Sequence, residues 1–177
     1  GTDTDHEGAW PKGPPSPSTS GYRTNRVLFP VTAQQPPLAR LVTAQTHLKV
    51  RSYELDSYGH VNHAAYLNYF EVARFEAMEA HGLSRNSMFE RGLKIYVVRI
   101  EVDYLAQVFF GDALTIETTF EKLRRSSLSF HQSAVAVSPE RASGPTVVAR
   151  ASVRSVWVSS EDGSPCQIPP EITNGHR

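Results

Sequence analysis

The stretch Leu48–Arg74, LKVRSYELDSYGHVNHAAYLNYFEVAR, decides how the rest of the chain is interpreted. Its first half places two carboxylates, two histidines, two tyrosines and an asparagine within residues 53–63. Its second half repeats apolar residues at steps of three and four, which indicates an amphipathic helix. Polar side chains gathered in a loop beside a rigid element are a common place for a functional site.

We expect this helix to run from about Asn62 to Ala80. Asn62 is a plausible N-cap, and Gly82 fits the left-handed position that follows a helix C-terminus. Leu67 and Met78 widen the apolar stripe of the helix, so most of its girth should be covered by other elements. The stripe consists of Tyr66, Tyr69, Phe70, Ala73, Ala77 and Ala80.

The remaining pattern predicts strands. One strand should precede the helix at 42–53, and a short helix at 84–90 should follow it. Four more strands are expected at 94–107, 112–123, 127–137 and 146–159, with alternating apolar positions such as Leu114, Ile116, Thr118 and Phe120. The connections at 109–112 and 124–126 are short, so we expect consecutive strands to pair antiparallel. These elements predict an α+β fold, with about five antiparallel strands curved around one long helix.

The length and composition define one folded domain. The chain has 177 residues, and seven of its 12 prolines lie in the first forty positions. We expect residues 1–41 to be a disordered Pro/Gly/Ser-rich tail, residues 42–172 to form the domain, and 173–177 to be a short C-terminal tail. The tail is a docking segment for a carrier protein, a remnant of a localisation signal, or a segment without a role.

Charge and cysteine content exclude several classes of protein. Lys plus Arg (18) equals Asp plus Glu (18), so no overall positive field is available to bind nucleic acid. No apolar run approaches the ~20 residues of a membrane span. The single cysteine, Cys166, rules out an intrachain disulfide and suggests a reducing compartment, so we expect a cytoplasmic protein.

Asp56 is the main candidate for chemistry. It lies a few residues before the helix N-terminus, where unpaired N–H groups stabilise an anion or an oxyanion. A carboxylate beside such amides suits acyl transfer to water. The alternative is that Asp56 only shapes an Asx-turn. His60 and His63 are either bases or hydrogen-bonding spacers, and because no fourth ligand accompanies these three residues we predict no metal site.

The other motifs are weaker. The sequence has neither a GxSxG nucleophile elbow nor a glycine-rich phosphate loop, and we predict no cofactor. Arg124 and Arg125, with Arg91 elsewhere, are either phosphate contacts or a solvated hairpin tip.

The quoted stretch resembles the signature of the hot-dog-fold thioesterases of the 4-hydroxybenzoyl-CoA thioesterase family, in which an acidic-D-x-x-G-x-V-x-x-x-x-Y pattern leads into the central helix. The resemblance continues through 90–92, 111–118 and 123–127 and covers about residues 46–172. It implies a hot-dog fold that forms a homodimer or homotetramer by joining sheets edge to edge.

The resemblance also implies a function. It points to a thioesterase that hydrolyses an acyl-CoA or acyl-carrier-protein substrate, with Asp56 as nucleophile or general base and His63 as a second catalytic residue. Two alternatives stay open: a hydratase or dehydratase on the same fold, and a non-catalytic module that binds acyl thioesters or lipids. The substrate-binding residues it implies are Tyr58, Gly59, His60, Asn62, Tyr66, Arg91, Arg124 and Arg125.

Overall fold

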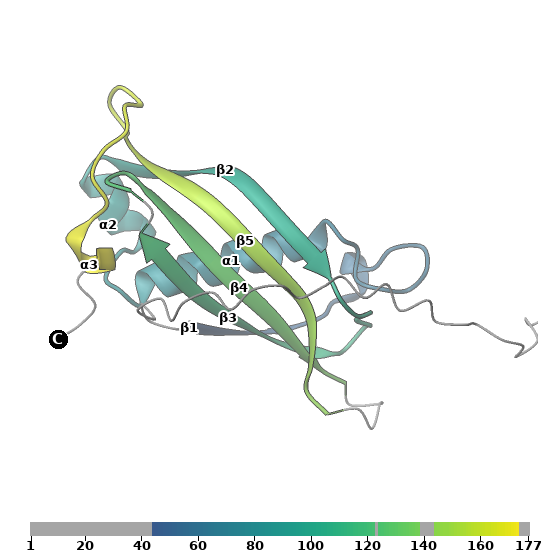
Figure 1. The fold of residues 1–177 in the computed structure, drawn as a ribbon. Coiled ribbons are helices and arrows are strands. Elements are labelled where there is room, and N and C mark those ends of the chain that lie inside the picture. The colour runs from purple at the N-terminus through teal and green to yellow at the C-terminus, as the bar shows by residue number, and fades with distance from the viewer. Residues whose placement is uncertain (1–43, 123, 139–143, 174–177) are drawn as a thin grey trace, which may run out of the picture. The chain divides into compact units, whose positions relative to one another are not determined.

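The computed structural model describes residues 44–122, 124–138 and 144–173 (Figure 1). The predicted tail at 1–41 and residues 174–177 lie outside the described residues. The chain forms β1 (Ala44–Lys49), a 3₁₀ turn η1 (Ser52–Glu54), α1 (Ala65–Glu79), α2 (Arg85–Glu90), β2 (Leu93–Tyr104), β3 (Ala113–Lys122), β4 (Ser127–Val137), β5 (Thr146–Ser159) and α3 (Pro170–Thr173).

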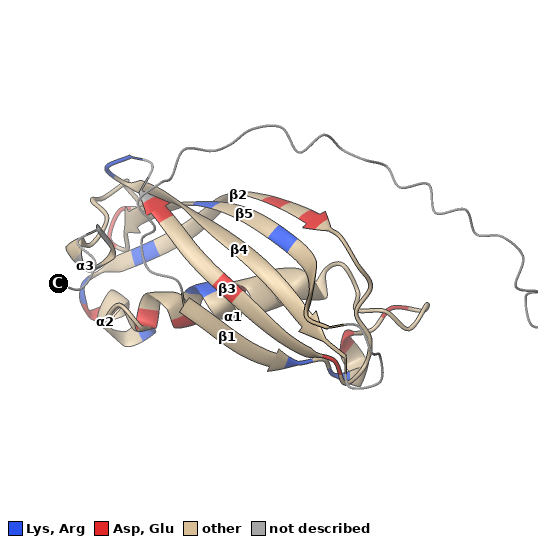
Figure 2. Ribbon diagram, turned by 60° about the horizontal axis from the view of Figure 1, so that its bottom comes forward, with Lys and Arg blue, Asp and Glu red and all other residues tan. Residues whose placement is uncertain are grey.

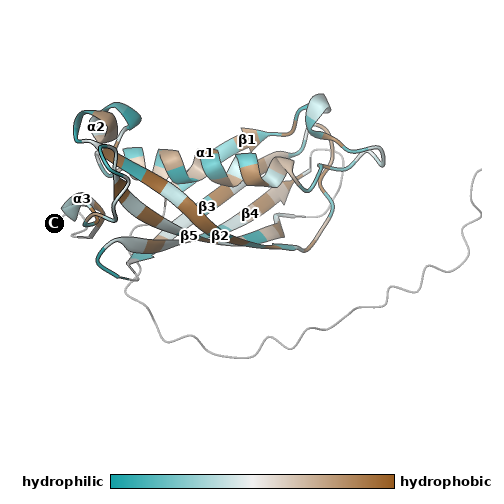
Figure 3. Ribbon diagram, turned by 90° about the horizontal axis from the view of Figure 1, so that it is seen from above, coloured by the Kyte–Doolittle hydropathy of each residue, from teal (hydrophilic) through white to brown (hydrophobic). Residues whose placement is uncertain are grey.

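The five strands form one antiparallel sheet in the order β1-β3-β4-β5-β2, and α1 lies along one of its faces (Figure 3). This arrangement confirms the predicted α+β fold. The predicted pairing of consecutive strands is correct for β3 with β4 and for β4 with β5, but wrong for β2 with β3. Residues 105–112 instead carry the chain from β2, at one edge, to β3 beside the other edge, because β2 forms its hydrogen bonds with β5.

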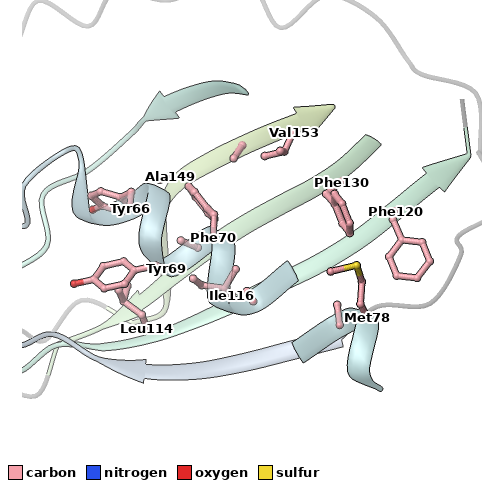
Figure 4. Packing of buried hydrophobic residues seen from close by; sticks show 14 of the residues in the cluster. Tyr66, Tyr69, Phe70, Met78, Leu114, Ile116, Phe120, Phe130, Ala149 and Val153 are labelled. Carbon is pink, nitrogen blue, oxygen red and sulfur yellow. The ribbon is translucent and has the colours of Figure 1, made fainter. Parts of the chain in front are cut away.

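The core lies between α1 and the sheet. Phe70, Ala73 and Ala77 of α1 are completely buried, and the small alanines allow the helix to approach the strands closely. The predicted buried face of β3 is confirmed, since Leu114, Ile116, Thr118 and Phe120 all point into the core. Figure 4 shows Phe70 of the helix and Leu114, Ile116 and Phe120 of the sheet in one cluster.

A buried polar network links α1 to the sheet inside this core. Arg74 donates a hydrogen bond of 3.0 Å to the side-chain oxygen Oε1 of Gln132. The side-chain nitrogen Nε2 of Gln132 donates to Phe70 O and to Thr118 Oγ1. Burial lowers the pKa of Arg74, because the charged guanidinium is largely removed from water. The network satisfies polar groups that would otherwise be buried without partners.

Three element boundaries in the described residues differ from the prediction by three residues or more. α1 begins at Ala65 rather than Asn62, because the Asn62 side chain accepts from Ala64 N in a local turn that precedes the helix. β1 ends at Lys49, since 52–54 form the turn η1. β2 ends at Tyr104, three residues before the predicted end.

β2 is an exposed edge strand with an apolar surface. Its outer edge has no neighbour in the sheet, and the side chains of Tyr96, Val97, Val98 and Ile100 are exposed. Acidic and basic residues are interspersed over the described fold, including the Tyr104 half of β2 (Figure 2). A long apolar edge is normally covered, because its unpaired N–H and C=O groups can hydrogen-bond another strand.

Candidate active site

The residue that the sequence singled out, Asp56, lies in a tight turn before α1. Asp56 Oδ1 accepts hydrogen bonds from Tyr58 N (2.9 Å) and His60 N (3.2 Å), which confirms the Asx-turn interpretation for this oxygen. Gly59 closes the turn with φ +81°, a conformation that a side chain disfavours. Asp56 Oδ2 accepts no hydrogen bond from the part of the chain that the structure describes, so one oxygen holds the turn and the other is available for chemistry.

The ends of the turn are fixed to the rest of the fold. Leu55 and Val61 form an isolated antiparallel bridge, and Val61 N donates to Val108 O at 2.8 Å. His60 pairs with Phe109 across a second bridge. The β2–β3 connection therefore supports the turn from a point about fifty residues away in sequence.

A cavity of about 440 Å³ opens beside Asp56. One wall comes from the turn and the start of α1, and the opposite wall from the end of β2 and the residues that follow it. Its lining contains carboxylate, imidazole and phenol groups among apolar ones. The lining residues are Asp56, His60, Val61, His63, Tyr66, Tyr104, Leu105, Ala106, Gln107 and Val108.

The two histidines have different surroundings. The His60 ring packs edge-on against Phe109, with 5.1 Å between ring centroids, which favours the spacer interpretation for His60. The His63 side chain is exposed, and its backbone oxygen accepts a hydrogen bond of 3.0 Å from Tyr104 Oη. His63 is therefore held by its backbone while its imidazole stays accessible at the cavity.

Tyr66 is the most buried polar residue of the cavity, with 3% of its surface exposed. Its ring contacts Tyr104, Tyr69 and Phe70 at centroid distances of 5.4, 5.9 and 6.3 Å. Burial, with smaller contributions from Tyr104 and Asp112, raises the pKa of Tyr66 to about 12. The phenol consequently stays protonated at neutral pH.

The other predicted binding residues do not line this cavity. Tyr58 is 82% exposed and contributes a backbone N–H, Gly59 supplies the turn conformation, and Asn62 orders the entry to α1. These three residues shape the site rather than face its cavity.

The three arginines lie at the opposite end of the protomer. Arg91 follows α2, beyond the C-terminal end of α1, whose 15 residues span about 22 Å. Arg124 and Arg125 lie in the β3–β4 connection, past a strand of ten residues that spans about 30 Å. Within one protomer they are not brought to Asp56.

Sequence reasoning missed two supports of the site. Tyr69 Oη donates to Glu54 Oε2, which joins α1 to the residue just before the turn. Tyr104 reaches the site from the end of β2, and no local pattern could have revealed a contact 41 residues away. A polar hydroxyl on the buried stripe of the helix was the available signal for Tyr69.

The described ranges contain neither a cluster of metal ligands nor a membrane-spanning helix. No three His, Cys, Asp or Glu side chains there lie close enough together to hold a metal ion. No helix among those residues is long and apolar enough to cross a membrane.

The chain is similar to known proteins in sequence and in fold. A profile of the thioesterase-like superfamily matches residues 50–175. Long-chain acyl-CoA thioesterase FadM of Escherichia coli K12 is 37% identical over 83 residues, which cover 47% of this chain and 62% of FadM. The chloroplastic acyl-acyl carrier protein thioesterase ATL2 of Arabidopsis thaliana is 31% identical over 88 residues, or 50% of this chain and 47% of ATL2. The matches thus span less than two thirds of these relatives.

The fold also matches solved structures. 4-Hydroxybenzoyl CoA thioesterase from Pseudomonas sp. strain CBS-3 superposes with a TM-score of 0.68 and 21% identity, covering 77% of this chain and 99% of that one. At this identity the likeness concerns the fold, and it confirms the predicted hot-dog architecture.

Proposed function

The chain belongs to the thioesterase-like superfamily, and we propose that it hydrolyses the thioester of an acyl-CoA or acyl-carrier-protein to a carboxylic acid and a thiol. The observation that carries this proposal is the divided role of Asp56. One carboxylate oxygen is fixed by two backbone N–H groups, while the other is available at a cavity shared with His63 and the start of α1.

Two routes use this arrangement. In the first, Asp56 Oδ2 attacks the thioester carbonyl, the C–S bond breaks, and water then hydrolyses the resulting anhydride. In the second, the carboxylate takes a proton from a water molecule that attacks the same carbon. Both routes end with an acid and a protonated thiol. The positive end of the α1 dipole favours the oxyanion in either case, and His63 is the accessible group that can deliver a proton to the leaving thiolate.

The partner is proposed to be a second copy of the chain joined through β2. Antiparallel pairing of two β2 edges about a two-fold axis would place the Leu93 end of one copy beside the Tyr104 end of the other. The far end of one protomer, which carries Arg91, would then approach the cavity of its neighbour. Arg124 and Arg125 follow at the same end, where they can meet the phosphates of coenzyme A.

The substrate class is proposed from chemistry and relatives together. FadM is named for long-chain acyl-CoA and ATL2 for acyl-carrier-protein, so both thiol carriers belong in the assay. The cavity wall of Val61, Leu105, Ala106 and Val108 suits an apolar acyl group. A cytoplasmic location is proposed on the single cysteine alone.

The deciding experiment follows thiol release from aryl-CoA, short-chain and long-chain acyl-CoA and acyl-carrier-protein for wild type and Asp56→Asn. Asparagine keeps a side-chain oxygen that can accept the two turn hydrogen bonds, so the fold should survive. The matched control is Asp162→Asn, since Asp162 caps a remote exposed turn through Ser164. We expect the rate to fall about 100-fold or more in Asp56→Asn only. Saturable binding without thiol release from wild type would instead favour the binding module.

A further inference from the structure

The starting observation is a cavity hydroxyl that makes no hydrogen bond within the described residues. Three tyrosines meet at the start of α1, and two of them use their hydroxyls within the fold: Tyr69 donates to Glu54 and Tyr104 donates to His63 O. Tyr66 lies between them and is at least nine-tenths buried, yet its hydroxyl makes no hydrogen bond to any residue in the described ranges. The hydroxyl oxygen itself is not fully buried, because it opens into the cavity beside Asp56, where a ligand can reach it.

The position of Tyr66 points to a ligand. It lines the same cavity as Asp56 and His63. Its ring is held by contacts with Tyr69, Phe70 and Tyr104, so the hydroxyl has little freedom to move. Figure 4 shows the hydroxyl ends of Tyr66 and Tyr69 turned away from the Phe120 and Phe130 end of the core. A donor that is fixed before substrate arrives needs no reorganisation during the reaction.

The chemistry of the group limits what it can bind. Burial keeps the phenol protonated through the neutral range, so it is available as a hydrogen-bond donor. Its natural partner is an acceptor oxygen on the substrate. The one acceptor oxygen that every thioester carries near the reacting carbon is its carbonyl oxygen.

Building on the proposed thioesterase function, we propose that Tyr66 is a catalytic residue whose hydroxyl donates a hydrogen bond to the thioester carbonyl oxygen. When Asp56 Oδ2 or a water molecule adds to the carbonyl carbon, the C=O electron pair moves to this oxygen. The Tyr66 O–H stabilises the resulting oxyanion and keeps its own proton. When the carbonyl re-forms and the C–S bond breaks, the tyrosine is unchanged.

The kinetic test compares Tyr66→Phe with Tyr104→Phe. Both remove one hydroxyl from the same cavity, but the Tyr104 hydroxyl is already used by His63 O. We expect kcat to fall about 100-fold in Tyr66→Phe and much less in Tyr104→Phe, with KM little changed in Tyr66→Phe. Thermal stability of Tyr66→Phe should equal that of wild type, because the hydroxyl makes no hydrogen bond to the described residues that the substitution would remove. A merely structural role would lower it.

The substrate pair hexanoyl-CoA and 3-hydroxyhexanoyl-CoA identifies the oxygen concerned. The proposal requires the same fold-loss for both. A loss confined to 3-hydroxyhexanoyl-CoA would mean that Tyr66 binds a substituent on the acyl chain, and it would overturn the proposal, as would unchanged kcat.

A measurement without turnover separates this proposal from the proposed function. Hexanoyl-CoA labelled with ¹³C at the carbonyl is bound to Asp56→Asn and to Asp56→Asn/Tyr66→Phe, and the carbonyl stretch is followed by infrared difference spectroscopy. We expect a lowered frequency that returns toward the solution value without the Tyr66 hydroxyl. If this shift is seen but the wild-type protein hydrolyses no thioester, only the hydrolase function is refuted. Hydrolysis by wild type with no such shift would refute only the role of Tyr66, and absence of both binding and hydrolysis would refute both.

Discussion

Tyr69 Oη donates a 2.7 Å hydrogen bond to Glu54 Oε2, and this contact links the first half of α1 to the residue just before the Asp56 turn. Glu54 Oε2 also accepts from Arg51 N, and Glu54 O accepts from Asn62 N at the other end of the turn. Glu54 therefore joins both ends of the turn to the helix. Burial, together with the Glu54 contact, raises the pKa of Tyr69, so the phenol remains a donor.

Removing the Tyr69–Glu54 hydrogen bond should make the Asp56 turn more flexible without removing a contact to the substrate. We expect Tyr69→Phe to lower kcat about tenfold and to destabilise the protein by about 1 kcal/mol, the usual contribution of one hydrogen bond. Thr46→Val is the matched control, because Thr46 Oγ1 bonds Glu76 Oε2 and ties α1 to β1 away from the turn. Equal losses of kcat in both variants would contradict the positioning role. Chemical unfolding and steady-state kinetics give the two readouts.

The left-handed conformation of Gly59 should matter for activity as well as for stability. Gly59→Val places a β-branched side chain at φ +81° and should cost about 1–2 kcal/mol. Gly163→Val is the control, since Gly163 has φ +72° in a turn remote from Asp56, and a Cβ meets no atom within 4 Å at either glycine. We expect similar losses of stability, with loss of thioester hydrolysis only in Gly59→Val. Normal hydrolysis by Gly59→Val would show that the turn tolerates distortion.

The buried hydrogen-bond network around Arg74 predicts that replacing the Gln132 side-chain amide will strongly destabilise the protein. Gln132→Leu leaves the buried guanidinium without its acceptor and Phe70 O without its donor, and we expect a loss of about 2–4 kcal/mol. Gln45→Leu removes an exposed hydrogen bond to Glu117 and should change stability by less than about 0.5 kcal/mol. Urea unfolding of the two variants tests this, and equal midpoints would contradict it.

The raised pKa of Tyr66 predicts how stability depends on alkaline pH. Between its ordinary value of 10.0 and about 12, the unfolded chain has lost the phenol proton while the folded protein retains it. Stability is therefore fully present below pH 10 and falls as pH rises through this window. Tyr66→Phe should show a shallower fall than wild type. Identical pH profiles of the unfolding free energy would refute the shift.

The apolar edge of β2 predicts an oligomer that a charge can break. Val98 is 57% exposed on this edge, and we expect Val98→Lys to convert the wild-type dimer or tetramer into monomers. Val137→Lys, at an exposed position on β4 with 45% exposure, should leave the assembly intact. Light scattering at micromolar concentration measures both, and a monomeric wild type would exclude a site shared between copies.

Local pattern was sufficient for the elements themselves. The alternation from Leu114 to Phe120 and the helical repeat from Tyr66 to Ala77 identified a strand face and a helix face that are buried as expected. The position of Asp56 before the helix was likewise readable, because a turn is built from neighbours in sequence. The start of α1 was misplaced since Asn62 caps a turn rather than the helix, and both conformations suit an asparagine.

The sequence by itself thus determined the helix, the strands and the turn that carries Asp56, all of which depend on spacing along the chain. Only the tertiary structure decided that β2 pairs with β5, that Tyr104 and Val108 complete the cavity, and that the arginines lie at the other end of the protomer. The physical reason is that hydrogen bonds between distant strands, and the burial of a side chain such as that of Tyr66, depend on the packing of α1 against the whole sheet.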